Sequence, residues 1–180
     1  MLRNKNKKDC LTGQFGFTMT ELLIVIFIIS LLSSLTLIGY RNGQKKYILS
    51  HDSQQLVTSL RKAQNMAISG INISGQHYGY GIYIEQNDSH YIIYADKNNN
   101  LSFQPSDGII ETINLSDKIE IQGLSPLSNK VDIFFQPPDP ITYVDGSDNV
   151  GLSATITLGI EETSLNKTIT ITTAGLIEEN

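Results

Sequence analysis

The sequence predicts an α+β protein, in which a long N-terminal helix packs against an antiparallel β-sheet or β-sandwich head. Three observations lead to this fold class. An uncharged apolar run covers Leu22–Tyr40, apolar residues then recur at helical spacing up to residue 69, and after residue 75 β-branched and aromatic residues alternate with polar ones. A length of 180 residues suits one globular domain with an anchor.

The first part of the helix, residues 17–40, is predicted to cross a membrane. Leu22–Tyr40 holds 19 residues without a charge, which is enough to span a bilayer as a helix. Four basic residues between positions 3 and 8 precede this run and favour an N-terminus in the cytoplasm. No small-residue cleavage site follows the run, so a removable secretory signal peptide is not predicted.

Residues 41–70 are predicted to continue the helix and to pack on the head. Apolar residues of this segment recur at steps of three, four or seven, as one face of a helix requires: Leu49, Leu56, Leu60, Ala63 and Ala67. Gly70 is the predicted end, because glycine commonly stands just past the last turn of a helix.

The remaining residues, 71–180, are predicted to form the β-rich head. Stretches of alternating β-branched and aromatic residues mark seven candidate strands: Tyr78–Glu85, Tyr91–Ala95, Ile109–Asn114, Lys118–Gln122, Val131–Phe135, Thr155–Ile160 and Thr168–Thr172. Segments rich in Asn, Asp, Gly and Pro separate them as turns. We expect antiparallel pairing, in two sheets.

Glu21 stands at the start of the apolar run, where a carboxylate is costly to bury in lipid. Together with Gly16, Phe17 and the basic leader, it resembles the processing and assembly segment of type IV pilins and of type II secretion pseudopilins. In that family a prepilin peptidase cuts after the glycine, and the new N-terminal residue is N-methylated. The resemblance implies a leader of residues 1–16, a cut after Gly16 and a methyl group on Phe17. Glu21 lies one helical turn past the new amine, so its carboxylate could pair with that amine or with the amine of a neighbouring subunit, and we expect the second pairing to set register during assembly.

The strand-rich head is similar to that of the GspH/FimT-type minor pseudopilins, which implies a pilin-like form of the α+β fold. The resemblance implies a structural subunit, not an enzyme, of a type IV pilus or a type II secretion pseudopilus. Its implied partners are the prepilin peptidase, other pilin or pseudopilin subunits, and an inner-membrane assembly platform. The chain is then expected in the bacterial inner membrane, with its head outside the cytoplasm, before it enters a filament.

Charge and local sequence weigh against DNA as a partner. Past residue 50, six Lys and Arg stand against sixteen Asp and Glu, and an acidic surface does not favour phosphate contacts. Some fimbrial members of the family bind DNA through arginines near a C-terminal glycine. Here the residues after Gly175 include two acids, Glu178 and Glu179, and no arginine, so DNA binding is not expected.

An alternative function stays open, namely a signal-anchored extracytoplasmic binding protein whose span does not polymerise. It predicts no cut after Gly16 and no dependence on Glu21. A cluster of tyrosines bears on this alternative, because it suits either cross-strand packing or a carbohydrate- or surface-binding platform. Its members are Tyr78, Tyr80, Tyr83, Tyr91 and Tyr94.

No cofactor is predicted, although one loop is a candidate calcium site. Asp96, Asn98, Asn100 and Asp107 place oxygen-bearing side chains at intervals that suit calcium. Leu101 occupies the position where an EF-hand loop has glycine, and the loop joins predicted strands instead of helices. The alternative is a plain hairpin turn in which Asn and Asp bond their own backbone.

Overall fold

The structure is a computed structural model that describes residues 16–70, 78–127, 129–138, 141–161 and 163–180. The predicted leader up to residue 15 lies outside the described residues, as do the side chains of residues 36–39 and 42. The chain divides into two compact units, Met1–Asn42 and Gly43–Asn180. The second unit contains the strands and the later part of the helix.

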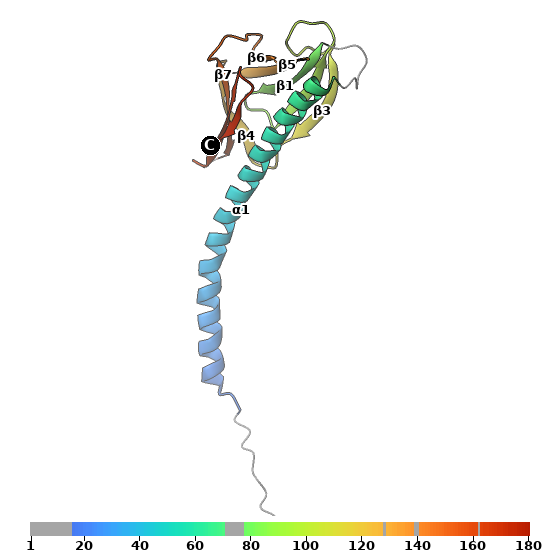
Figure 1. Cartoon of the computed structure of the whole chain (residues 1–180). Helices are drawn as coiled ribbons and strands as arrows, with labels where there is room; N and C mark the ends of the chain where they lie inside the picture. The colour runs from blue at the N-terminus through green and yellow to red at the C-terminus, as the bar shows by residue number, and fades with distance from the viewer. Residues whose placement is uncertain (1–15, 71–77, 128, 139–140, 162) are drawn as a thin grey trace, which may run out of the picture. The chain divides into compact units, whose positions relative to one another are not determined.

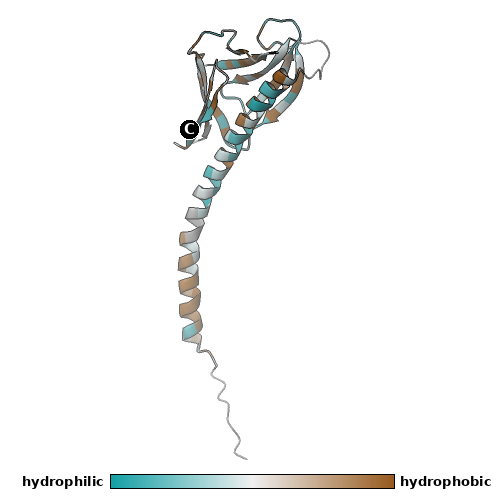
Figure 2. Cartoon of the chain, in the orientation of Figure 1, coloured by the Kyte–Doolittle hydropathy of each residue, from teal (hydrophilic) through white to brown (hydrophobic). Residues whose placement is uncertain are grey.

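Helix α1 spans Met19–Ser69 and ends where the sequence predicts. Gly70 adopts the left-handed region (φ +58°), and its N–H donates to the carbonyl of Ala67 (3.2 Å). Figure 2 shows the early part of α1 as predominantly hydrophobic. Among the described residues, no helix has the length and apolar character needed to cross a membrane. The predicted span Leu22–Tyr40 includes residues 36–39, whose side chains are not described.

The later part of α1 packs against the strands through the predicted face (Figure 1). Every residue of that face is buried, with no more than 3% of its surface exposed: Leu49, Leu56, Leu60, Ala63 and Ala67. Met66 adds a further buried side chain on the last turns of the same helix. The helical spacing of the apolar residues therefore identified the packed side of α1.

The head consists of two antiparallel sheets, as predicted. The first sheet has the order β3-β2-β1-β5-β6, and the second has the order β4-β7-β8-β9. The strands are β1 Gly79–Glu85, β2 His90–Asp96, β3 Gly108–Asn114, β4 Ile119–Ser125, β5 Lys130–Gln136, β6 Ile141–Val144, β7 Ser153–Ile160, β8 Asn166–Thr172 and β9 Ile177–Glu179. All seven predicted strands are confirmed with shifts of a few residues at their ends, and so is the α+β class.

Two strands escaped prediction, β6 and β9. β6 is only four residues long and follows a proline-rich turn, so its alternation is too short to stand out. β9 reads Ile177-Glu178-Glu179, which has poor strand propensity. It forms because the chain reverses at Gly175 (φ +79°) and then pairs with β8. Pairing partners, not local sequence, decide such short edge strands.

One core joins α1 to the inner faces of both sheets. Tyr80, Ile82 and Ile84 of β1 belong to it, as do Ile156 of β7 and Ile169 of β8. The outer side of the first sheet carries a separate aromatic group, in which Tyr94 of β2 and Phe134 of β5 are fully buried. Their ring centroids lie 6.4 Å apart. Cross-strand packing thus accounts for Tyr80, Tyr91 and Tyr94, all of which are buried.

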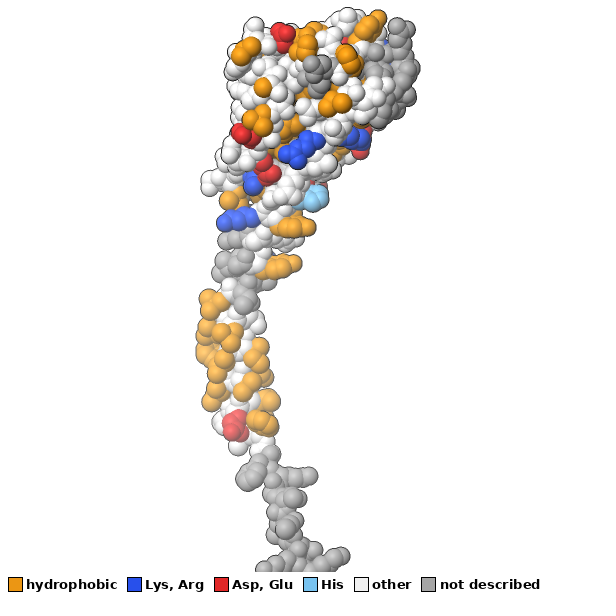
Figure 3. All heavy atoms as spheres, viewed as in Figure 1, with side chains coloured by type: hydrophobic (Ala, Val, Ile, Leu, Met, Phe, Trp, Pro, Cys, Tyr) orange, Lys and Arg blue, Asp and Glu red, His pale blue; other side chains and the backbone are white. Residues whose placement is uncertain are grey.

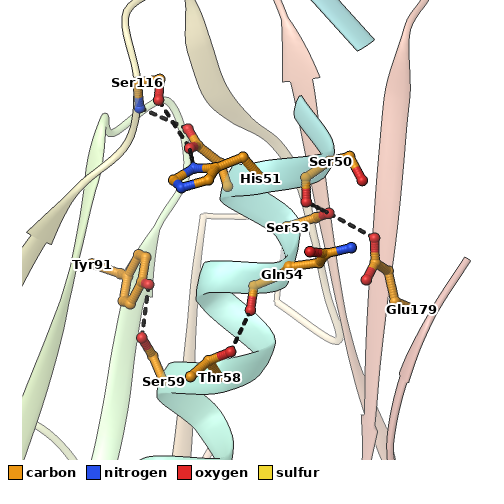
Figure 4. A network of polar contacts seen from close by, with 10 residues as sticks. Ser50, His51, Ser53, Gln54, Thr58, Ser59, Tyr91, Ser116 and Glu179 are labelled. Carbon is orange, nitrogen blue, oxygen red and sulfur yellow. Dashed lines mark hydrogen bonds and ion pairs between the residues drawn. The ribbon is translucent and has the colours of Figure 1, made fainter. Parts of the chain in front are cut away.

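Buried and partly buried polar contacts fix α1 to the head at three places (Figure 4). Asp52 accepts hydrogen bonds from the backbone N–H and the hydroxyl of Ser116, at 2.7 and 2.9 Å. The Ser53 hydroxyl donates to Glu179 of β9 (2.7 Å). Ser59 and the Tyr91 hydroxyl of β2 are 2.9 Å apart and share a hydrogen bond. These contacts reach both sheets, so they set the rotation of α1 about its own axis.

Replacing Gly81 by alanine should destabilise the head by roughly 1–3 kcal/mol, because the first sheet has no room for a methyl group there. A Cβ at Gly81 would lie 2.5 Å from the ring of Tyr94, which is fully buried and donates to Asp132. Gly123→Ala is the matched control, since its Cβ would meet only ordinary contacts at 3.6 Å from Thr157. Urea unfolding of the purified full chain measures both; equal stabilities for the two variants would contradict the packing argument.

Candidate functional site

The Gly16–Phe17 peptide bond lies just outside α1. Residues 16–18 are not helical, and α1 begins at Met19. Gly16 is exposed, and the Phe17 side chain is 85% exposed. A peptidase needs an accessible bond outside a helix, and the predicted cutting point is both exposed and non-helical.

Thr18 and Glu21 form a reciprocal cap at the first turn of α1. The N–H and the hydroxyl of Thr18 both donate to Oε2 of Glu21, at 2.9 and 2.8 Å. In return, the Glu21 N–H donates to the Thr18 hydroxyl oxygen (3.2 Å). This arrangement is a capping box, in which Thr, then Glu three residues later, satisfy helix N–H groups that have no partner within the helix.

The capping box places the Glu21 carboxylate next to the predicted new N-terminus. Glu21 already accepts from the N–H of Thr18, the residue that directly follows Phe17. A cut after Gly16 would create a charged amine on Phe17, one residue from that hydrogen bond. Sequence analysis singled out Gly16, Phe17 and Glu21 but missed Thr18. The Thr-x-x-Glu spacing before an apolar run was the signal that would have found it.

The candidate calcium residues lie in the connection between β2 and β3. Asp96 accepts from the N–H groups of Asn98, Asn99 and Leu101. Asp107 accepts from the N–H groups of Lys97 and Gln104. These bonds are those of an Asx-type turn, in which carboxylates hold their own loop. Among the described residues, no group of three or more His, Cys, Asp and Glu is placed to hold a metal. The calcium site stays a prediction.

A third carboxylate, Asp132 of β5, anchors the same loop to the first sheet. It accepts hydrogen bonds from the hydroxyl of Tyr94 (2.6 Å) and from the N–H of Phe103. Burial raises the pKa of Asp132 to about 6, in opposition to these hydrogen bonds, which lower it. Burial, followed by the negative charge of Asp132, raises the pKa of the Tyr94 hydroxyl far above its ordinary value. The loop over the first sheet therefore rests on a buried, largely enclosed carboxyl group.

Comparison with known proteins identifies the N-terminal segment. A model of the prokaryotic N-terminal methylation motif matches residues 11–37. The match indicates a substrate of the type IV pilin or pseudopilin kind. It covers Gly16, Phe17, the capping box and the early apolar turns of α1, and it implies processing by a prepilin peptidase and assembly with pilin subunits. No curated protein and no solved structure matches the chain.

Thr18→Ala should loosen the start of α1, because it removes the hydroxyl that accepts from Glu21 N–H. We expect the amides of Glu21 and Leu22 to exchange their hydrogens about fivefold faster in this variant. Glu21→Gln is the matched control, since a glutamine side chain also completes a capping box. Hydrogen exchange followed by mass spectrometry measures both. Unchanged exchange in Thr18→Ala would show that the cap does not hold the first turn.

The raised pKa of Asp132 should make the head more stable at mildly acidic pH than at neutral pH. Its folded pKa of about 6 exceeds its ordinary value of 3.8, so the folded chain binds this proton more tightly than the unfolded chain. Its contribution to the free energy of unfolding therefore increases as the pH falls through 6 towards 3.8. Between pH 7 and pH 5 the unmodified chain should gain about 1 kcal/mol relative to Asp132→Asn.

Urea unfolding at the two pH values measures this difference. The charge of Asp145, whose pKa burial also raises, is one cause of the raised pKa of Asp132, so both chains are compared in an Asp145→Asn background as well. If the free energies of unfolding of the two chains changed equally between pH 7 and pH 5, the raised pKa of Asp132 would be ruled out.

Proposed function

We propose that the chain is a structural subunit of a type IV pilus or a type II secretion pseudopilus, of the minor GspH/FimT type. It is cut after Gly16 and N-methylated on Phe17 before assembly. The observation that carries this proposal is the accessible Gly16–Phe17 bond directly before a capped helix start, inside the matched methylation motif. The role is structural, and the chain is the peptidase's substrate and not itself an enzyme.

The early part of α1 supports an environment of lipid and neighbouring helices. Its large side chains between Leu22 and Leu35 are exposed on every side of the helix, and Figure 3 shows one side of this apolar surface. This is the pattern of a helix covered by other apolar groups. The hydroxyls of Ser30 and Ser34 donate to carbonyls of their own helix, at Ile26 and Leu31 (2.8 Å each). Serine hydroxyls bonded in this way do not need water as a hydrogen-bond partner. We therefore place this segment in the inner membrane first and in the filament afterwards, with the head outside the cytoplasm.

Glu21 supplies the reason for ordered assembly. An isolated carboxylate among apolar groups is destabilising, and so is an isolated amine, whereas the pair formed between two subunits relieves both. The Phe17 amine that follows cutting is the group of opposite charge that the chain itself provides. Pairing between subunits would then fix the register in which the apolar helices pack. The assembly platform and other pilin-type subunits are the partners that this role requires.

Production of the full chain beside a prepilin peptidase tests the proposal. Intact mass and N-terminal sequencing should show loss of residues 1–16 and one methyl group on Phe17. Gly16→Val should keep the leader, because a side chain at the cut blocks the peptidase. Gly13→Val is the matched control, a nearby glycine of the same segment, and should be processed normally.

A second arm separates the filament subunit from a signal-anchored binding protein. Glu21→Gln should be cut as before but should assemble poorly, since the capping box persists and only the charge is lost. A chain that stays full-length while a control prepilin is cut would refute the proposal. If the Glu21→Gln variant were cut and assembled as well as the unmodified chain, the role assigned to Glu21 would be refuted.

A further inference from the structure

The outer face of the first sheet has a hollow of about 310 Å³ whose lining is partly aromatic and partly acidic. Tyr83 of β1 and Phe103 of the β2–β3 loop form its aromatic wall, with ring centroids 4.9 Å apart. Pro105 of the same loop also lines it, and Glu85 and Asp88 line it at the β1–β2 turn. These five residues are here called the acidic hollow. A concave surface with an aromatic wall and a few charged groups is the usual form of a ligand site.

The aromatic wall is held in place by contacts within the head. The N–H of Phe103 donates to the buried carboxylate of Asp132. The ring of Phe103 also lies edge-on to the ring of Tyr94, which is fully buried, at a centroid distance of 5.3 Å. The wall therefore exists without a ligand, and binding does not have to order it.

The turn that carries the two acids is fixed as well. The N–H of Gln86 donates to the carbonyl of Asn129 (2.8 Å), just before β5, and the N–H of Asn87 donates to the carbonyl of Ile121 in β4 (3.0 Å). The turn is thus tied to the second sheet and to the segment that enters the first. Because the acids of the hollow stand on either side of these two residues, their backbone positions relative to the aromatic wall are set.

Within the described part of the chain, no Lys or Arg pairs with the acids of the hollow. Glu85 forms no ion pair there, although Lys130 lies opposite it on β5. Asp88 has only a ring nitrogen of His90, at 3.5 Å. Arg61 makes no ion pair in that part of the chain either, but it lines two other hollows on α1 and not this one. The hollow therefore offers two acids that a cation from outside the chain can reach.

The negative charge of the hollow acts on its aromatic wall. The pKa of the Tyr83 hydroxyl is raised, first by burial and then by the charge of Glu85, with Asp132 and Asp88 adding to it. The face of an aromatic ring attracts a cation, and carboxylates beside that ring attract it further. The lining of the hollow therefore favours a positively charged ligand.

Among the cations found in proteins, the guanidinium group of arginine matches this lining best. It is planar, so it can stack on an aromatic ring while its N–H groups, which lie in the same plane, donate to carboxylates. The ammonium group of lysine has no flat face with which to stack. The stem of an arginine would pack on Pro105, since long charged side chains bury their CH₂ groups along apolar surface.

We propose that the acidic hollow binds an arginine side chain of another protein, with the guanidinium against Tyr83 and Phe103 and its N–H groups on Glu85 and Asp88. Charge complementarity favours this occupant beyond the hollow itself, because residues 71–180 contain fifteen Asp and Glu against four Lys and no Arg. The partner is a different polypeptide, since a minor subunit has chains other than its own copies as neighbours. The site rests on the geometry of the head alone, so its test does not depend on a cut after Gly16.

Three tripeptides with blocked ends test the proposal on the full chain in detergent, through the NMR shifts of its backbone amides. Gly-Arg-Gly should bind saturably and shift the amides of Glu85, Asp88 and Phe103. Gly-citrulline-Gly, which has nearly the same shape without the charge, should bind about tenfold more weakly. Gly-Lys-Gly should also bind more weakly, because it cannot stack.

N-methylguanidinium separates a protein's arginine from a free guanidine compound. It lacks most of the arginine stem, so it should bind more weakly than Gly-Arg-Gly. Equal affinity would overturn a protein as the source of the ligand. Absence of saturable shifts with Gly-Arg-Gly overturns the site, and so do shifts confined to amides outside the hollow. Equal affinity for the citrulline or the lysine peptide overturns the assignment of a guanidinium ligand.

Variants of the hollow give the second arm of the test. Glu85→Gln with Asp88→Asn should weaken the binding of Gly-Arg-Gly about tenfold. Asp117→Asn with Asp148→Asn is the matched control, since it removes two charges from exposed residues outside the hollow and should leave the affinity unchanged. Phe103→Leu should weaken binding while it keeps every charge.

Equal losses in the two paired variants would show that only the net charge of the head attracts the peptide, and would overturn the site. Unchanged affinity in Glu85→Gln with Asp88→Asn would do the same. A salt titration gives a further readout, since a contact between exposed charges should weaken as ionic strength rises. A chain that is cut and methylated but does not bind the arginine peptide would keep the proposed function and lose only this site.

Discussion

The head depends on the burial of one face of α1 between two sheets. Each sheet has an apolar inner face, and the leucine and alanine face of the helix is the surface that both of them share. Burial of about 25 cal/mol per Å² of apolar surface makes this shared core the main source of stability. Without the helix, the inner residues of β1 and β8 would lose a large part of their cover. The fold is thus a helix-centred core, and the strands are arranged around it.

Apolar burial alone does not fix how the helix is turned, because leucines tolerate small rotations. Asp52, Ser53 and Ser59 remove that freedom, since each must keep a hydrogen-bond partner on a different part of the head. A buried carboxylate or hydroxyl left without its partner costs about 1–3 kcal/mol. Polar groups on the packed face therefore determine which side of α1 faces outward. The orientation of Arg61 towards solvent follows from contacts made on the opposite side of the same helix.

Periodicity explains what the sequence could and could not predict. The helix and seven strands were predictable, because spacings of 3.6 and 2.0 residues report directly which side is buried. β6 and β9 were not, since three or four residues carry too little pattern and their pairing comes from distant strands. Gly16, Phe17 and Glu21 were predicted through a motif, whereas Thr18 needed the geometry of a helix start. The joining of Tyr83, Glu85, Asp88 and Phe103 into one hollow depends on how a loop folds back over a sheet, and no local spacing encodes it.

Under the proposed function, Glu21 would connect processing to assembly through its present partners. In the uncut chain its carboxylate is occupied by the N–H and hydroxyl of Thr18 and so completes the first turn of the helix. A cut after Gly16 would add a positive amine one residue away, which would strengthen the attraction at that carboxylate without removing the cap. A carboxylate oxygen accepts more than one hydrogen bond, so the same group can hold its own helix start and bind the amine of a neighbour. The cap would keep the acid in a fixed place while a new partner arrives, and a fixed acid is what a defined register between subunits requires.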